Sequence, residues 1–141
     1  RIIFHNRYAT SGDYTDHNNN QPISVNDMSL VFNGVIDMRT KEEMQESYNI
    51  EMQTENDGEL VIQLCGNDKE KIIDYIKKIK GRFAGLIMMN NKMYAIRNKN
   101  RPAWKLEYNN ATYIASTKDI FKRVNEFLQP EELTPYQLYE F

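Results

Sequence analysis

Two Asn-Asn pairs in the second half of the chain limit the folds open to it more than any other feature. Asn90-Asn91 and Asn109-Asn110 each lie between two short runs of strand-like composition. Asparagine tolerates the backbone of a tight turn, so each pair is predicted to join the strands of a β-hairpin. The four predicted strands are residues 83–89, 93–97, 104–108 and 112–116. A short helix over 118–125 and a terminal strand over 133–141 are predicted to follow.

The first half of the chain carries the signals of three helices, over residues 41–47, 59–65 and 69–80. Thr40 is placed to cap the first helix, with Glu43 at the spacing of a capping box. Asp68 is placed to cap the third, whose isoleucines recur at helical spacing. Gly81 follows that helix and is predicted to be its C-cap.

Strands and a loop are predicted around these helices. Residues 1–7 are predicted to enter the fold as a strand, and 8–22, rich in Ser, Gly, Asp, Thr and Asn, as a long loop. Residues 29–32 form a second short strand, which Asn33-Gly34 is predicted to end because that pair favours positive φ. Residues 48–54 are predicted to return as a further short strand.

This order, a strand, then helices, then an antiparallel meander, indicates a layered α+β fold. The chain has 141 residues without repeats or linkers, so we predict a single domain over 1–141. A formal charge of −2 gives no reason to expect nucleic acid as a partner. No apolar run reaches membrane-spanning length, and the one cysteine, Cys65, fits a reducing, cytoplasmic setting.

Three polar segments supply the groups that would hold a free amino acid by both ends. Arg7 offers a cation for the α-carboxylate, Asp57 an anion for the α-ammonium, and Asn33-Gly34 N–H donors for a side-chain carbonyl. Each also has a plainer interpretation. Arg7 could be an exposed or ion-paired residue at a strand end, Asn33-Gly34 a hairpin turn, and Asp57 the N-cap of the helix over 59–65. Capping by Asp57 is compatible with its binding an ammonium.

Seven segments, in order along the chain, resemble the class II glutamine amidotransferases. These are the N-terminal-nucleophile hydrolase domains of glucosamine-phosphate synthase, amidophosphoribosyltransferase and asparagine synthetase. The matching segments are residues 5–12, 20–23, 32–36, 54–60, 81–84, 95–98 and 115–117. The first contains Arg7, the third Asn33-Gly34 and the fourth Asp57. Each motif is short, and it is their shared order that carries the resemblance.

The resemblance implies an αββα sandwich, in which two antiparallel sheets lie between helical layers. It implies that glutamine is the substrate, that its side-chain amide is hydrolysed, and that a synthase domain or subunit accepts the ammonia. Asn33, through its side-chain amide, and Gly34, through its backbone N–H, would form the oxyanion hole. No cofactor and no metal are implied. The implied substrate-binding residues are Arg7 on the carboxylate, Asp57 on the ammonium, and Tyr8, Thr10 and Gly58 in the pocket.

The nucleophile of that family is a mature N-terminal cysteine, whose own α-amino group serves as the base. The sequence begins at Arg1 inside an apolar run, so we expect the segment with that cysteine to precede it. Phe32 stands where a histidine is common before Asn-Gly. Cys65 is predicted to be an inert core thiol. His5 and His17 have no third residue at metal-ligand spacing.

Two other functions stay open on the sequence alone. One is a catalytically inactive relative, a glutamine-binding or structural interaction module, which a start without cysteine would favour. The other is an N-terminal-nucleophile hydrolase that acts on a different amide. The presence of both Arg7 and Asp57 argues against the latter, because that pair selects a free amino acid.

Overall fold

A computed structural model describes residues 2, 3, 5 and 15–141 of the chain. The strands in this part are β1 (Ile23–Val25), β2 (Met28–Val35), β3 (Arg82–Met89), β4 (Lys92–Arg97), β5 (Trp104–Tyr108), β6 (Ala111–Ala115), β7 (Glu131–Glu132) and β8 (Tyr139–Glu140). The helices are the 3-10 helix η1 (His17–Asn19) and the α-helices α1 (Lys41–Tyr48), α2 (Glu59–Cys65), α3 (Lys69–Lys78) and α4 (Asp119–Val124).

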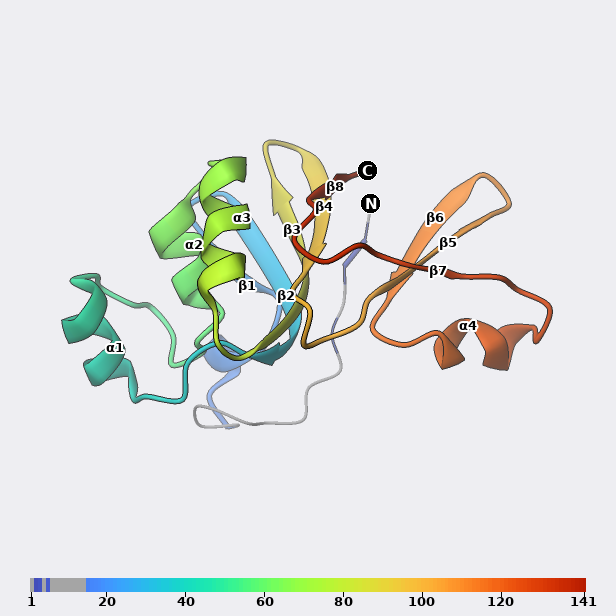
Figure 1. Ribbon diagram of the computed structural model, residues 1–141. Coiled ribbons are helices and arrows are strands. Elements are labelled where there is room, and N and C mark those ends of the chain that lie inside the picture. Colours follow the sequence, from blue (N-terminus) through green and yellow to red (C-terminus); the bar gives the residue numbers. More distant parts are fainter. Residues whose placement is uncertain (1, 4, 6–14) are drawn as a thin grey trace.

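The strands form two antiparallel sheets. The larger sheet has the strand order β1-β2-β3-β4-β8, and the smaller has the order β6-β5-β7. Figure 1 shows α2 and α3 against the larger sheet, and the smaller sheet with α4 on the other side of it. This succession of helices, sheet, sheet and helix confirms the predicted α+β fold with an αββα arrangement.

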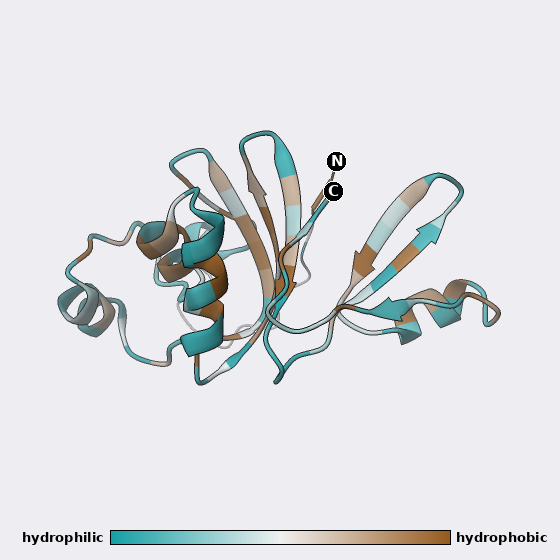
Figure 2. Cartoon of the chain, turned by 45° about the horizontal axis from the view of Figure 1, so that its top comes forward, coloured by the Kyte–Doolittle hydropathy of each residue, from teal (hydrophilic) through white to brown (hydrophobic). Residues whose placement is uncertain are grey.

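The main hydrophobic core lies between the larger sheet and the helices α2 and α3. Leu30 and Phe32 of β2 and Ile87 of β3 reach it from the sheet, because alternate side chains of a strand point to the same face. Ile72 and Ile76 reach it from α3, and both are fully buried. Accordingly α3 is hydrophobic on the side that faces the sheet and hydrophilic on its outer side (Figure 2).

A second, smaller core joins the opposite face of the larger sheet to the rest of the chain. Its buried members are Ala84, Ala95, Ala103 and Leu133, with Ile114 of β6 packed against them. Three of these four buried residues are alanines, whose small side chains leave space between the layers. The cavity described below opens at this face.

Several local sequence signals are confirmed. Both Asn-Asn pairs, 90–91 and 109–110, have positive φ and join the strands of the two predicted hairpins. Thr40 and Glu43 form the predicted capping box at the start of α1. The Asp68 carboxylate accepts hydrogen bonds from two backbone N–H groups in the first turn of α3.

The predicted terminal strand over 133–141 is wrong. Within this segment only the two-residue strand β8 forms. The two-residue strand β7 lies just before the segment, and the chain turns between β7 and β8 at Tyr136, which has φ 62°. The backbone N–H of Tyr136 donates to the carbonyl oxygen of Arg97 at 2.8 Å. This hydrogen bond to the end of β4 stabilises the turn, and the segment therefore does not form one continuous strand.

The predicted strand over 48–54 is also wrong, because side chains take the backbone N–H groups that a ladder would use. The N–H of Met52 donates to Gln45 Oε1 at 2.8 Å. The N–H groups of Gln53 and Thr54 each donate to the carboxylate of Glu59 at 2.7 Å. The segment therefore remains a loop tied to α1 and α2.

The prediction that Asn33-Gly34 ends its strand is wrong. β2 continues to Val35, and Gly34 lies opposite Phe83 of β3. Gly34 has φ +151°, and a Cβ at this position would lie 1.8 Å from the carbonyl oxygen of Arg82. Glycine is needed here because two backbones approach each other closely, which is one of the uses of glycine inside a strand.

The prediction that Gly81 caps α3 is wrong for a similar reason. The helix ends at Lys78 with Ile79 as its C-cap, and Gly81 is not among the residues of positive φ. A Cβ on Gly81 would lie 2.0 Å from the carbonyl oxygen of Val35. This glycine allows the chain to pass close to the end of β2 before β3 begins.

Residues 1, 4, 6 and 7 of the predicted strand over 1–7, and residues 8–14 of the predicted loop over 8–22, fall outside the described residues. Within that loop, residues 17–19 form η1, which Asp16 caps through its carboxylate. No helix in the described part of the chain has both the length and the apolar character needed to cross a membrane.

Acid is expected to weaken the attachment of β8. Glu140 pairs with Lys69 of α3 at 2.8 Å and with Lys92 of β4. These lysines lower the pKa of Glu140 from 4.5 to about 2. A depressed folded-state pKa adds stability that is present above pH 4.5 and lost as the pH falls towards 2. The effect is small and salt-sensitive because the three side chains are exposed.

Urea unfolding from pH 5 to pH 2 measures this effect. The free energy of unfolding should fall more steeply with acid in the wild type than in Glu140→Gln. A variant of the exposed Glu46 of α1, Glu46→Gln, is the matched control and should keep the slope of the wild type. Equal slopes for all three proteins would contradict a role of these ion pairs in stability.

Candidate functional site

A cavity of about 580 Å³ opens on the face of β2 and β3 that is turned away from α2. Residues of β2 and β3 form one wall, and residues of β6 and α4 form another. Three of the residues predicted from the sequence, Asn33, Gly34 and Asp57, line this one cavity. The fold thus brings together two segments that the sequence separates by a helix and a loop.

The free edge of β2 beside this cavity is held by side chains. β1 pairs with β2 only as far as Leu30. Beyond that point the backbone N–H of Phe32 donates to Gln21 Oε1 at 2.5 Å. The N–H of Ile36, just after the strand, donates to Asp57 Oδ2 at 2.6 Å. Side chains from two distant loops therefore replace the missing neighbour strand.

The N–H of Gly34 points to this same edge, because backbone N–H groups alternate sides along a strand. It lies between the N–H groups of Phe32 and Ile36, which already have side-chain acceptors. Gly34 also lines the cavity. Gly34 thus combines a backbone N–H at the free edge of β2 with a place in the cavity wall, which is compatible with the oxyanion-hole role predicted for it.

Asp57 is a buried carboxylate in the wall of the cavity, with 2% of its surface exposed. Its Oδ2 accepts hydrogen bonds from the backbone N–H groups of Ile36 and Asp37, at 2.6 and 2.9 Å. Burial raises the pKa of this carboxyl group, and these two hydrogen bonds oppose that rise in part. A carboxylate can accept about four hydrogen bonds, so a ligand cation can still bind here.

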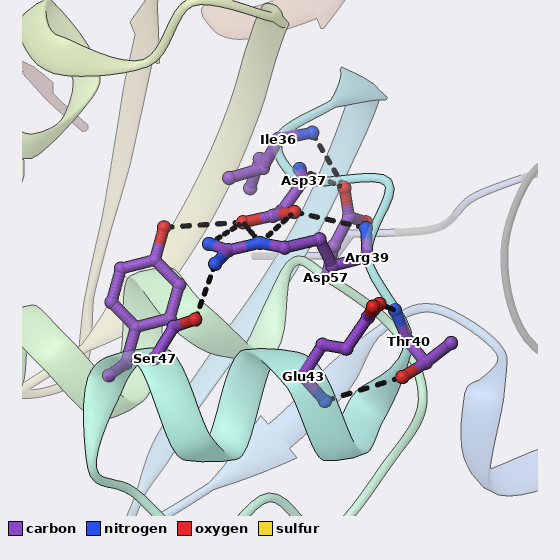
Figure 3. A network of polar contacts seen from close by, with 8 residues as sticks. Ile36, Asp37, Arg39, Thr40, Glu43, Ser47 and Asp57 are labelled. Atoms are coloured by element: carbon purple, nitrogen blue, oxygen red, sulfur yellow. Dashed lines mark hydrogen bonds and ion pairs between the residues drawn. The ribbon is translucent and has the colours of Figure 1, made fainter.

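The alternative interpretation of Asp57 as the N-cap of the following helix is wrong. The N-cap of α2 is Gly58, and no side chain caps this helix. The carboxylate of Asp57 is instead directed to the loop after β2, as Figure 3 shows. Its position at the start of α2 still favours a negative charge through the helix dipole.

The loop that holds Asp57 is tied to α1 by a network of polar contacts (Figure 3). The Arg39 guanidinium pairs with Asp37 Oδ2 at 2.6 Å, and its Nη1 donates to Ser47 Oγ at 2.5 Å. Tyr48 donates its hydroxyl proton to the same carboxylate at 3.2 Å. The hydrogen bond from Arg39 lowers the pKa of Asp37. The loop is therefore held in the conformation that presents its N–H groups to Asp57.

The segment that precedes Asp57 is fixed by buried polar side chains. Glu59 is fully buried and accepts hydrogen bonds from the backbone N–H and the hydroxyl of Thr54, at 2.7 and 2.8 Å. Asn56 donates its side-chain N–H to the carbonyl oxygen of Asn19 at 2.9 Å. A fully satisfied polar network of this kind imposes a single conformation. The position of Asp57 is therefore set from both sides.

Asn33 contacts a residue to which the sequence analysis assigned no role. Its Oδ1 accepts a hydrogen bond from Arg101 Nη2 at 2.9 Å, and both residues line the cavity. Arg101 lies in the loop that follows β4. No local pattern joins it to β2, so only the three-dimensional arrangement shows the contact.

Four predicted site residues remain: Arg7, Tyr8, Thr10 and Gly58. Arg7, Tyr8 and Thr10 lie outside the described residues. Gly58 is not among the residues that line the cavity, and it packs against the core side of β2. A Cβ on Gly58 would lie 2.4 Å from the ring of Phe32, so this glycine permits close packing of α2 on the sheet.

Cys65 is a core thiol, as predicted. It has 5% of its surface exposed, and its Sγ contacts the carbonyl oxygen of Lys71 at 3.7 Å. Burial raises the pKa of the Cys65 thiol to about 11. At neutral pH it is therefore protonated and a poor nucleophile.

His5 lies in the wall of the cavity.

Similarity to solved structures agrees with this architecture. One similar structure is that of glutamine phosphoribosylpyrophosphate amidotransferase from B. subtilis complexed with ADP and GMP, with 24% identity to this chain and a TM-score of 0.71. Another is described as the allosteric regulatory enzyme of purine biosynthesis, with 23% identity and a TM-score of 0.72. Each alignment covers 97% of this chain, and 33% and 34% of the respective neighbour. The chain thus spans about a third of these proteins, and at this identity the likeness shows the fold.

Comparison with sequence families is more specific. No curated protein matches the chain significantly. The family described as a glutamine amidotransferase domain matches residues 5–123, which include every segment of the cavity wall named above. Because this match spans most of the sequence, the chain belongs to the glutamine amidotransferase domain family.

Proposed function

We propose that the intact protein hydrolyses the side-chain amide of glutamine to glutamate and ammonia, and that a synthase domain or subunit accepts the ammonia. The observation that carries the proposal is the shared cavity of Asn33, Gly34 and Asp57. Membership of the glutamine amidotransferase domain family supports the choice of substrate.

Asn33 and Gly34 supply the donors that amide hydrolysis needs. Attack on the amide carbonyl places a negative charge on its oxygen, which fixed N–H groups stabilise in the transition state. The backbone N–H of Gly34 and the side-chain Nδ2 of Asn33 take this role. Loss of one such donor typically costs about 3–4 kcal/mol of transition-state stabilisation.

Asp57 binds the α-ammonium group of glutamine. A free amino acid brings a cation, and the buried carboxylate has no salt bridge within the described residues. A ligand ammonium offsets the cost of burying that charge. Arg7 binds the α-carboxylate of glutamine, and Tyr8 and Thr10 line the pocket. These three proposed roles rest on the sequence motif.

The nucleophile is expected on an N-terminal cysteine of the intact protein, since Cys65 is buried and protonated. The cysteine thiolate adds to the amide carbonyl carbon, the C–N bond breaks, and the nitrogen takes a proton and leaves as ammonia. Water then adds to the thioester carbonyl, releasing glutamate and the free thiol. The α-amino group of the cysteine carries the proton in both steps.

A glutaminase assay of the intact protein tests this proposal. Incubation with L-glutamine should release ammonia and glutamate in equal amounts, and replacement of the N-terminal cysteine by alanine should abolish both. Binding of glutamine without any turnover would instead identify the inactive relative and overturn the hydrolysis. A protein that neither binds nor cleaves glutamine would overturn the substrate assignment as well.

A further inference from the structure

We propose that Arg101 is a positioning residue that fixes the side-chain amide of Asn33 with its nitrogen directed to the reacting carbonyl. The inference rests on the proposed glutaminase function. It assigns a role to a cation that lines the cavity and that no sequence motif marks.

The contact between the two side chains determines which way the amide faces. A guanidinium has only donors, so the atom of Asn33 that meets Arg101 Nη2 at 2.9 Å must be the oxygen. The amide nitrogen then lies on the other branch of the same planar group. With its oxygen held by Arg101, Asn33 can turn only its N–H donors towards a ligand in the cavity.

Arg101 is itself held in place. Its carbonyl oxygen accepts a hydrogen bond from Arg97 Nη1 at 3.2 Å, and Pro102 follows it. Arg97 is a buried residue of β4 that also pairs with Glu132 of β7 at 2.7 Å. The backbone of Arg101 is therefore fixed by a residue that contacts both sheets. Such support is what a residue needs in order to orient a catalytic group.

A second feature of Arg101 sets it apart from a surface arginine. Its Nε is buried, and no described residue accepts a hydrogen bond from it. A buried donor without a partner is energetically unfavourable, and such groups call for an explanation beyond packing. A cation held beside Asn33 raises the positive potential where the oxyanion develops, which is the physical advantage of the arrangement.

Without Arg101 the amide of Asn33 can rotate and present its oxygen to the substrate. An oxygen in that position repels the negative charge that develops in the transition state. Binding of the uncharged amide in the ground state changes little. The expected consequence is a loss in kcat, with a much smaller change in KM. An arginine that served only to hold the loop would act on stability, and would act equally whether or not Asn33 carried an amide.

The test uses the intact protein and four variants: Arg101→Met, Arg101→Lys, Asn33→Ala and the double variant Arg101→Met/Asn33→Ala. Arg101→Met should lower kcat by roughly 10- to 100-fold with KM changed less than threefold, and Arg101→Lys should recover part of the loss. In the Asn33→Ala background the same change should lower kcat by less than about threefold, because the two residues act as one unit. Lys99→Met, in the same loop and exposed, is the matched control and should match the wild type.

Equal losses from Arg101→Met in both backgrounds would overturn the proposal and leave Arg101 a structural residue. A second readout does not depend on turnover. The side-chain amide signals of Asn33 in ¹⁵N NMR, identified by their absence in Asn33→Ala, should shift towards random-coil values in Arg101→Met and stay fixed in Lys99→Met. Unchanged signals in Arg101→Met would also overturn it. A wild type without glutaminase activity sinks the proposed function, and the NMR result then decides on the orientation of Asn33 alone.

Discussion

Gly34→Ala is expected to be the most damaging single substitution in the described part of the chain. The new Cβ would lie 1.8 Å from the carbonyl oxygen of Arg82, which is backbone and cannot rotate away. The φ of +151° adds strain for any side chain. Overpacking and backbone strain each cost about 1–3 kcal/mol, so we expect a loss of about 2–6 kcal/mol. Against a usual total of about 5–15 kcal/mol, much of the stability disappears.

Urea unfolding followed by circular dichroism measures this loss, and Gly66→Ala is the matched control. Gly66 also has positive φ, 53°, yet a Cβ there would meet no atom within 4 Å. Its replacement should cost only about 1–2 kcal/mol, the penalty of the left-handed backbone. If Gly34→Ala costs no more than Gly66→Ala, the close approach of β2 to β3 is not a constraint on this fold.

Asp57→Asn is expected to separate binding from stability. The asparagine oxygen can still accept the two N–H bonds from Ile36 and Asp37, but the charge that holds the ammonium is gone. A hydrogen bond to a charged group contributes about 1.5–3 kcal/mol. Affinity for glutamine should therefore fall roughly 10- to 100-fold. Isothermal titration calorimetry on the intact protein measures it, with the exposed Asp74→Asn of α3 as control.

The direction in which glutamine affinity changes with pH can also be predicted. Burial raises the folded-state pKa of Asp57. The fraction of Asp57 that is protonated in the free protein therefore increases as the pH falls through that pKa. Only the ionised form binds an ammonium, and glutamine affinity should therefore rise with pH through the same range. Asp57→Asn should remove this step and should not lower the stability at neutral pH. An Asp57→Asn protein with the affinity and pH profile of the wild type would contradict the assignment.

Features set by neighbouring residues were predictable from the sequence. The capping box of Thr40 and Glu43, the cap at Asp68 and the Asn-Asn turns all depend on contacts within a few residues. Such contacts are visible as short motifs. The helices and hairpins therefore appear close to their predicted bounds.

Features set by distant parts of the chain were not predictable in this way. Gly34 and Gly81 look like residues that end an element, but each is required by a close approach of β2 to residues that follow α3. Tyr136 turns the chain because the end of β4 offers it an acceptor. The same holds for the site: Asn33 and Asp57 were found through motifs, whereas Arg101 reaches Asn33 from a loop 68 positions away.

The central claim is that glutamine binds in the cavity with its side-chain carbonyl at Gly34 and Asn33. Titration of L-glutamine into the ¹⁵N-labelled intact protein, with its N-terminal cysteine replaced by alanine to stop turnover, tests this most directly. We predict saturable shifts of the Gly34 backbone N–H and of the Asn33 side-chain N–H signals, with D-glutamine much weaker. Binding that leaves both signals unmoved, or shifts confined to another part of the protein, would contradict the account.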